Sequence, residues 1–218
     1  MTKLNLDSGF SIADRAYLEL EERIVTLRLP PGSVLSEQGQ AADLEFGRTP
    51  IREAFRRLER EGLVVILPRR GILVSDINVQ TQLNLLDTRR EIERLLARQS
   101  AERASSEQKE EFALIGRKLR EFSDQIDDVT FARWDNRLTY LEFEASQNEF
   151  AAKAMGLMHG LSRRFWAKYH RRYANILETA AAHANLAEKI AAGDTAAAAA
   201  ASDELLDNIV AFTKRTLG

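Results

Sequence analysis

A helical pattern that runs directly into a hairpin pattern most constrains the fold of this chain. Thr49-Pro50 supplies a capping hydroxyl followed by a proline at the first helical position, where the missing N–H costs nothing. Gly62 follows the last apolar position, as glycine often does after a helix. Two β-branched runs, at 63–67 and 72–74, then flank a turn that contains proline, two arginines and glycine. We therefore predict a helix followed by a β-hairpin.

The residues before this helix predict two more helices. Apolar side chains recur at helical spacing from Ile12 to Leu27, and the run Leu29-Pro30-Pro31-Gly32 ends that pattern. Ser36 is a candidate N-cap for a second, short helix that reaches about Glu45. Three helices followed by a hairpin are the outline of a winged helix.

The charges of the chain are balanced overall but concentrated locally. There are 31 Lys and Arg against 33 Asp and Glu, a net charge of −2, so any nucleic-acid partner needs a local basic surface. Residues 47–71 hold seven arginines and three glutamates, a local charge of +4. Arg52, Arg56 and Arg60 are spaced four apart and therefore share one face of the predicted helix. We expect that helix to carry a basic surface.

Composition also excludes several kinds of site and segment. Because the chain contains no cysteine, it has no disulfide, no thiolate nucleophile and no Cys-ligated metal. The first ten residues lack the apolar core of a signal peptide, and no apolar run approaches the length of a membrane span. We therefore expect a cytoplasmic protein without a membrane partner.

Beyond residue 80 the sequence shows no strand pattern. We expect helices at 80–104, 107–126, 130–146, 149–168, 170–191 and 195–216, with breaks at Asp127-Asp128 and Gly193-Asp194. Ser75–Val79 is the expected linker between two domains, residues 1–76 and 77–218. The predicted fold class is mainly α: an N-terminal winged helix-turn-helix of three helices and a β-hairpin, followed by an all-α helical bundle.

The predicted winged helix is suited to binding double-stranded DNA. Its third helix can enter a major groove, where Arg48 and Arg52 are placed for paired hydrogen bonds to a guanine. Other arginines lie where phosphates or a minor groove are expected: Arg56, Arg57, Arg60, Arg69 and Arg70. Charge alone leaves open the alternative that this helix is merely exposed and charged.

Three stretches carry a resemblance to a known family: the run from Arg48 to Leu63, Leu29-Pro30-Pro31-Gly32 before Leu35, and Gly71 before Val74. With them, residues 12–76 closely resemble the winged-helix domain of the GntR family of bacterial transcription regulators. The resemblance implies an operator DNA partner, with contacts from Gln38, Arg48, Thr49, Arg52, Arg56, Arg57, Arg69, Arg70 and Gly71. The family often has Arg in place of Gln38 and usually Ser or Thr in place of Gly47, so the operator sequence stays open.

The rest of the chain carries a second resemblance. Its motifs run from Arg89 to Glu93, from Asp135 to Asn148 and from His183 to Asp194. They resemble the all-helical ligand-binding FCD domain found in the FadR branch of GntR regulators. The resemblance implies a homodimer whose DNA binding responds to a small organic acid, bound by Arg89, Asp135, Thr139 and His183.

The resemblance also raises the question of a metal ion. Many FCD domains bind a divalent cation through an Asp and three His, and here Asp135 and His183 match two of these positions. Thr139 and Leu205 stand at the other two. Two ligands make a poor site for zinc or nickel, which normally take three or four protein groups. We expect a metal-free pocket unless other side chains substitute.

These observations favour a DNA-binding transcription regulator, a repressor modulated by an effector, over an enzyme. The sequence contains no motif for nucleophilic catalysis or for cradling a phosphate. Two alternatives stay open. The first is a constitutive DNA binder whose sensor domain is degenerate, and the second is a helical enzyme that uses Asp135 and His183 as an acid/base pair.

Overall fold

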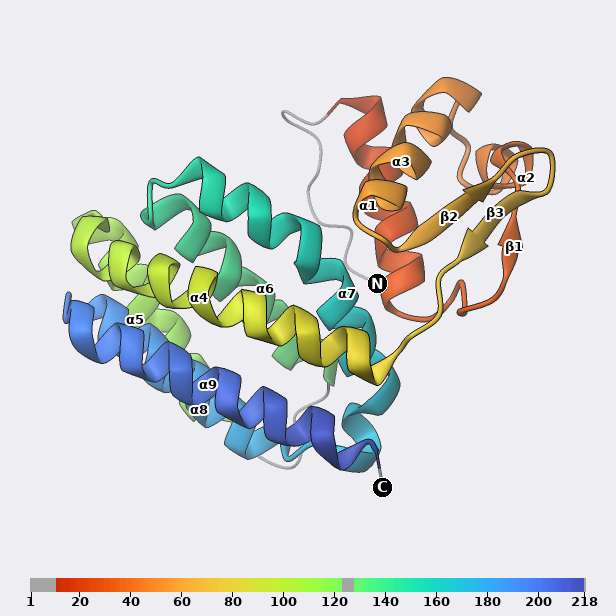
Figure 1. Cartoon of the computed structure of the whole chain (residues 1–218). Coiled ribbons are helices and arrows are strands. Elements are labelled where there is room, and N and C mark those ends of the chain that lie inside the picture. Colours follow the sequence, from red (N-terminus) through yellow and green to blue (C-terminus); the bar gives the residue numbers. More distant parts are fainter. Residues whose placement is uncertain (1–10, 123–127, 218) are drawn as a thin grey trace. The chain divides into compact units, whose positions relative to one another are not determined.

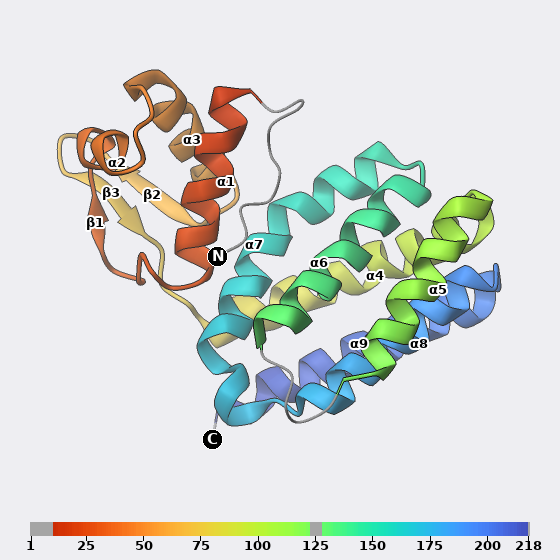
Figure 2. The same cartoon turned by 180° about the vertical axis from the view of Figure 1, so that it is seen from behind.

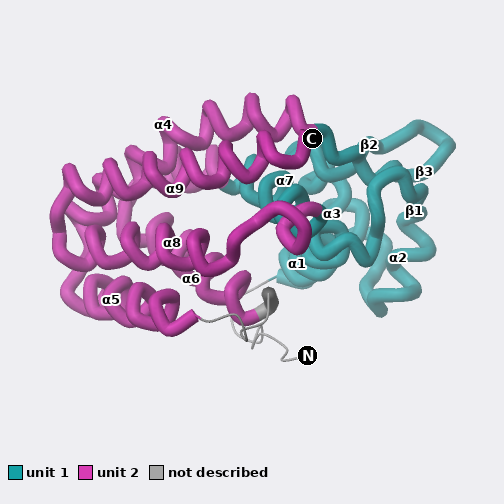
Figure 3. The backbone as a smooth tube through the Cα atoms, turned by 90° about the horizontal axis from the view of Figure 1, so that it is seen from below, with its two compact units in different colours: residues 1–78, 156–168 teal, residues 79–155, 169–218 magenta. Residues whose placement is uncertain are grey.

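A computed structural model describes residues 11–122 and 128–217, without the side chains of 128 and 129. The backbone divides into two compact units, which are coloured separately in Figure 3. The first unit ends at Asn78 and also contains residues 156–168. The second unit begins at Val79 and contains the remaining helical residues.

The first unit is a winged helix, as predicted (Figure 1). Its elements are α1 (Ile12–Val25), β1 (Val34–Leu35), α2 (Glu37–Asp43), α3 (Arg48–Arg60), β2 (Val64–Leu67) and β3 (Gly71–Val74). The strands form an antiparallel sheet in the order β1-β3-β2. Strand β1 was not predicted, because a strand of two residues is too short to show an alternating pattern.

Local chemistry explains the ends of α3. Gly62 adopts a left-handed φ of +73°, and the amide of Leu63 donates to the carbonyl of Leu58, which confirms the predicted C-terminal glycine. The predicted Thr49 cap is wrong: α3 begins at Arg48, and Gly47 is the N-cap without a side-chain hydrogen bond. Pro50 is therefore the third helical residue. It fits there because amides of the first turn have no helical acceptor in any case.

Two further glycines have defined roles in this unit. Ser36 caps α2 by accepting a hydrogen bond from the amide of Gly39, as predicted for Ser36. A Cβ on Gly39 would lie 2.9 Å from the Ser36 hydroxyl oxygen, so glycine leaves room for the cap. Gly71 has a φ of +103°, and a Cβ there would lie 2.7 Å from the carbonyl oxygen of Leu35. Glycine is thus required where β3 passes β1.

The helices of the remaining chain are α4 (Val79–Arg103), α5 (Ser106–Arg120), α6 (Asp128–Ala145), α7 (Glu149–Tyr173), α8 (Ile176–Ala191) and α9 (Thr195–Arg215). In the second unit α4 packs on α9, α9 on α8 and α8 on α5, while α6 contacts α4, α5 and α8 (Figure 2). This arrangement confirms the predicted all-α bundle. Within the described residues, no helix combines the length and apolar character needed to span a membrane.

Three predicted helix boundaries are wrong. The helix expected to end at 168 continues to Tyr173, and α8 starts only after Asn175, whose side chain accepts hydrogen bonds from two amides of its first turn. The helix expected to reach 126 ends at Arg120. The predicted break at Asp127 lies outside the described residues. Gly193 and Asp194 do separate α8 from α9, as expected.

Residues 156–168 of α7 pack within the first unit. A Cβ on Gly160 would lie 2.9 Å from a methyl carbon of Leu63, so the absence of a side chain permits close contact. Arg164 is 2% exposed and donates hydrogen bonds to the carbonyl oxygens of Ser75 (2.9 Å) and Asp76 (3.2 Å). Burial lowers the pKa of Arg164 to about 10. This segment therefore contributes a buried cation to the unit that carries the winged helix.

Candidate functional site

The α3 helix presents a basic face to solvent. Its apolar side chains Ile51, Phe55 and Leu58 are buried in the core of the first unit. Because the helix is amphipathic, its polar residues lie on the opposite side, and the exposed ones include the predicted DNA contacts Arg48, Thr49, Arg52 and Arg56. The local excess of positive charge found in the sequence therefore lies on one accessible surface.

Arg52 on this face is paired with Glu37, the first residue of α2. The Arg52 Nε lies 3.1 Å from both carboxylate oxygens of Glu37, and an Nη lies 2.9 Å from one of them. The hydrogen bonds from Arg52, together with the charges of Arg48 and Arg56, hold the pKa of Glu37 below its usual value. Glu37 was not predicted as a site residue, because the pair is formed by residues 15 positions apart on different helices.

Arg57 has different surroundings from Arg52. Its guanidinium carbon lies 3.5 Å from the centre of the Tyr17 ring, over the ring face, and its nitrogens lie 3.5 Å from Asp14 and 3.3 Å from Glu61. The Tyr17 hydroxyl donates to Glu61 at 2.9 Å. Burial raises the pKa of Glu61, although its hydrogen bonds from Tyr17 and Arg57 oppose this. The structure thus directs Arg57 toward α1.

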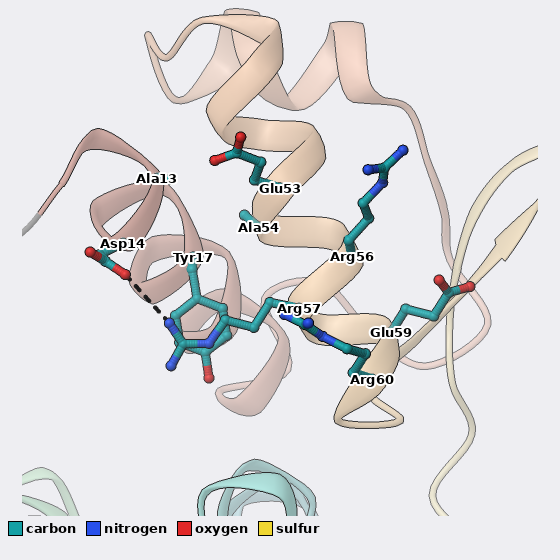
Figure 4. Close-up of a pocket in the computed structure, with 9 residues that line it drawn as sticks. All are labelled: Ala13, Asp14, Tyr17, Glu53, Ala54, Arg56, Arg57, Glu59 and Arg60. Carbon is teal, nitrogen blue, oxygen red and sulfur yellow. Dashed lines mark ion pairs between the residues drawn. The ribbon is translucent and has the colours of Figure 1, made fainter. Parts of the chain in front are cut away.

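These contacts lie in an open groove of about 570 Å³ between α1 and α3 (Figure 4). The figure shows Arg57 across the face of Tyr17, whereas Arg56 points away from that ring. Glu53 and Arg60 also line the groove. One helix therefore uses neighbouring arginines in two ways, one against the protein and one toward solvent.

The other predicted DNA contacts are exposed or half-exposed. Arg69 and Arg70 lie at the exposed tip between β2 and β3, and the Arg70 amide closes the turn on the Leu67 carbonyl at 3.0 Å. Gly71 follows at the start of β3, and Gln38 is exposed in α2. The tip arginines make the hairpin a second basic feature of the same unit.

The second unit brings Asp135 and His183 together. Nε2 of His183 lies 3.0 Å from a carboxylate oxygen of Asp135, and Nδ1 lies 2.8 Å from the carbonyl oxygen of Thr179. Burial disfavours a charged imidazole, but the hydrogen bond and charge of Asp135 outweigh it and raise the pKa of His183. Because both ring nitrogens face oxygen acceptors, the geometry suits the doubly protonated ring. Phe131 packs edge-on against this ring.

Arg89, the other predicted effector residue with a charge, is paired on its own helix. It forms a close ion pair with Glu93, with nitrogen–oxygen distances of 2.5 and 2.6 Å. Burial, reinforced by the charges of Glu93 and Asp135, raises the pKa of Glu142 well above its ordinary value. Thr139 is half-buried one turn after Asp135 on α6. The predicted effector residues thus lie in an environment rich in carboxyl groups.

The residues at this place do not fit a metal ion. Asp135 and His183 are hydrogen-bonded to each other, Thr139 offers no imidazole, and Leu205 is a buried apolar side chain of α9. In the parts of the chain that the structure describes, no three His, Asp or Glu side chains gather in a group that could hold a metal. We derive no role for zinc or nickel from this geometry.

Two family models match most of the chain. The model of bacterial regulatory proteins of the gntR family matches residues 12–74, and the FCD domain model matches residues 84–208. The first match covers the complete winged helix from α1 to β3. The second covers the Asp135–His183 pair and the Arg89–Glu93 pair.

Curated relatives are similar over part of their length. An HTH-type transcriptional regulator of Streptomyces ambofaciens is 44% identical over 62 residues, 28% of this chain and 26% of that protein. The HTH-type transcriptional repressor RspR of Escherichia coli K12 is 34% identical over 90 residues, 41% of this chain and 40% of that protein. The Nta operon transcriptional regulator of Aminobacter aminovorans is 28% identical over 60% of this chain and 62% of that protein. The matches thus span less than two thirds of each relative.

Solved structures share the fold over nearly the whole chain. Escherichia coli McbR/YncC has a TM-score of 0.81 at 16% identity, over 96% of this chain and 100% of that chain. A Rhodococcus sp. RHA1 protein described as a GntR transcriptional regulator has a TM-score of 0.66 at 20% identity, over 94% and 99%. At these identities the comparison establishes the fold alone.

Proposed function

The chain belongs to the gntR family of bacterial regulatory proteins and carries an FCD domain, and from this membership we propose that it regulates transcription by binding operator DNA. The observation that carries the proposal is the exposed arginine face of α3 within a complete winged helix. Such a face neutralises phosphates and presents donors to base edges, which are the two requirements of specific DNA binding.

In this proposal the N-terminal half of α3 enters the major groove. Arg48 and Arg52 would read base edges, because a guanidinium can donate two parallel hydrogen bonds to guanine O6 and N7. Arg56 lies one turn after Arg52 and would meet a phosphate, while Arg69 and Arg70 would reach the backbone or the minor groove from the wing. The Arg57 contacts with Tyr17 and Glu61 support a different role, that of holding α1 against α3.

The chain would act as a homodimer on a pseudo-palindromic operator. One recognition helix reads only a few base pairs, so pairing two copies about a twofold axis is the usual route to a longer site. We further propose that the dimer, when bound to its operator, blocks transcription, which would make the protein a repressor. The similarity to RspR, which is described as a repressor, supports this direction.

The helical unit would hold the effector that modulates DNA binding, as in the FadR branch of the family. The pairs Arg89–Glu93 and Asp135–His183 supply largely buried polar groups inside the bundle. A small carboxylate would enter by replacing Glu93 on Arg89, since a guanidinium binds either carboxylate by the same geometry. No metal ion is part of this proposal.

The experiment that tests the DNA-binding proposal uses the full chain and a library of randomised duplexes. Several rounds of selection should enrich one sequence family, and Arg52→Ala should weaken binding to it by about 1–3 kcal/mol while random DNA is affected less. Equal weakening on selected and random duplexes would remove Arg52 from base reading. A library that stays random after selection by the wild-type chain would reject the function itself.

One observation favours a second candidate, a constitutive DNA binder with a degenerate sensor. Thr139 and Leu205 replace two groups that bind the metal in many FCD domains, and the remaining two groups are hydrogen-bonded to each other. The candidates are separated by a screen of carboxylic acids for release of the selected duplex. Release by one acid, lost in Arg89→Ala, would support the effector proposal. Unchanged affinity with every acid would favour the constitutive binder.

A further inference from the structure

The Arg52–Glu37 pair leaves one edge of the guanidinium available. A guanidinium has two donor edges, one formed by Nε with the nearer Nη and one formed by the two Nη groups. The hydrogen bonds to Glu37 come from Nε and from a single Nη, so they occupy the inner edge. The outer edge of Arg52 therefore keeps two parallel N–H groups, and its side chain is 54% exposed.

This outer edge has the geometry that guanine requires. Guanine presents O6 and N7 as two neighbouring acceptors in the major groove, and a bidentate arginine satisfies both. A free arginine side chain must first be ordered from many rotamers, which costs free energy on binding. An arginine already held by a carboxylate has lost that freedom before DNA arrives.

Glu37 also affects the electrostatics of this surface. Its carboxylate accepts hydrogen bonds from Arg52, and these, with the charges of Arg48 and Arg56, lower the pKa of Glu37. A negative charge on a DNA-binding face weakens attraction to the phosphates of every DNA sequence. At the correct base pair, the oriented Arg52 regains part of that loss through its hydrogen bonds.

We propose that Glu37 is a positioning residue for sequence discrimination: it holds the inner edge of Arg52 so that the outer edge reads a guanine, and its charge disfavours non-specific DNA. The inference rests on the proposed DNA-binding function. Helix α2 would thus contribute to base recognition indirectly, through its contact with Arg52 on α3. Glu37 itself contacts no base in this arrangement.

The test is a double-mutant cycle on the duplex selected by the wild-type chain. Glu37→Gln keeps the shape of the side chain but removes its charge. We expect it to raise affinity for a random duplex by about twofold to threefold and to lower discrimination at the base pair read by Arg52 by about fivefold to tenfold. In the Arg52→Ala background, Glu37→Gln should leave discrimination unchanged, because its effect passes through the arginine.

Glu53→Gln is the matched control for charge. Glu53 is an exposed carboxylate on α3 that lines the groove toward α1. Its neutralisation should raise affinity for random DNA as well but should preserve discrimination at the Arg52 base pair. Thermal unfolding of each variant verifies that the winged helix is folded.

Two results would overturn the proposal. Unchanged discrimination in Glu37→Gln would show that Arg52 needs no carboxylate to hold it. A loss of discrimination that persists in the Arg52→Ala background would show that Glu37 reads a base directly, for example a cytosine amino group. Both results require that the wild-type chain selects a sequence, so they are distinct from failure of the proposed function.

Discussion

The arginines of α3 and the predicted effector residues of the helical bundle are arranged in opposite ways. On α3 the arginines are exposed, and Arg52 is held at one edge only. In the bundle, Arg89 and His183 are largely buried, and each is already paired with a carboxylate. The arginine face of α3 can therefore bind a ligand without rearrangement. In the bundle, a ligand must first displace the carboxylate that is already paired with Arg89 or His183. Substitution of an arginine that points to solvent should change DNA binding, and substitution of a charged residue that packs against the protein should change stability.

The largest effect is expected where a buried arginine donates its hydrogen bonds to backbone carbonyls. Arg164→Met removes the donors to the carbonyls of Ser75 and Asp76 and leaves these acceptors unsatisfied. We expect the free energy of unfolding to fall by about 3 kcal/mol, measured by urea denaturation. Arg172→Ala, which removes an exposed arginine of the same helix, should change it by less than about 0.5 kcal/mol. Equal effects would show that burial of Arg164 is unimportant.

Arg56 and Arg57 allow the comparison to be made within one helix. Arg57→Ala removes the contacts with Tyr17, Asp14 and Glu61 and should lower the free energy of unfolding by about 1–2 kcal/mol. Arg56→Ala should leave stability unchanged but reduce the slope of log affinity for DNA against log salt by about 1. Denaturation and salt titration of both variants check this. The reverse pattern would assign the two arginines the opposite roles.

The His183 pair should make stability depend on pH. Because the pKa of His183 is raised in the folded chain, its contribution is fully present below the unfolded value of about 6.5 and is lost as pH rises through the folded value. The raised pKa of Glu142 acts in the same direction, with the loss beginning near the unfolded carboxyl value. Asp135→Asn should reduce the fall in the free energy of unfolding above neutral pH. Glu142→Gln should reduce the fall in the free energy of unfolding at lower pH. Urea denaturation between pH 5 and 9 measures both, and unchanged curves would contradict the assignment.

The smallest effect is expected for an exposed pair of the bundle. Arg120 and Glu188 form two hydrogen bonds of 3.0 and 2.9 Å, but both side chains are more than 40% exposed. Replacing both by alanine in a double-mutant cycle should give a coupling energy below about 1 kcal/mol that shrinks further in high salt. A coupling as large as the Arg164→Met effect would mean that exposure does not separate the two classes of charge.

The sequence was informative where a local rule decides the structure. Proline, glycine and β-branched runs predicted the winged helix, and Gly62 lies at the helix end where it was expected. Helix ends were predicted wrongly where more than one residue could cap or interrupt the helix. Thr49 was expected to cap α3, but Gly47 does so, and the chain continues as helix past 168 because no proline or glycine interrupts it before Asn175.

The features of the candidate sites also divide into those that local sequence predicts and those that depend on distant residues. Helical spacing predicted the shared face of Arg52 and Arg56, since it depends on neighbouring residues alone. The partner of Arg52, the turn of Arg57 toward Tyr17 and the burial of Arg164 against the carbonyls of Ser75 and Asp76 depend on residues distant in sequence. Asp135 and His183 were placed in one site only through the family resemblance, and the structure brings them within 3.0 Å.

We propose that the arginine face of α3 reads a specific DNA sequence. The most direct measurement is parallel selection of randomised duplexes by the wild-type chain and by Arg52→Ala, followed by sequencing. We predict that the wild-type chain enriches two inverted half-sites and that Arg52→Ala loses preference at one guanine in each. Identical sequence preferences in the two pools, or no enrichment by the wild-type chain, would contradict the account.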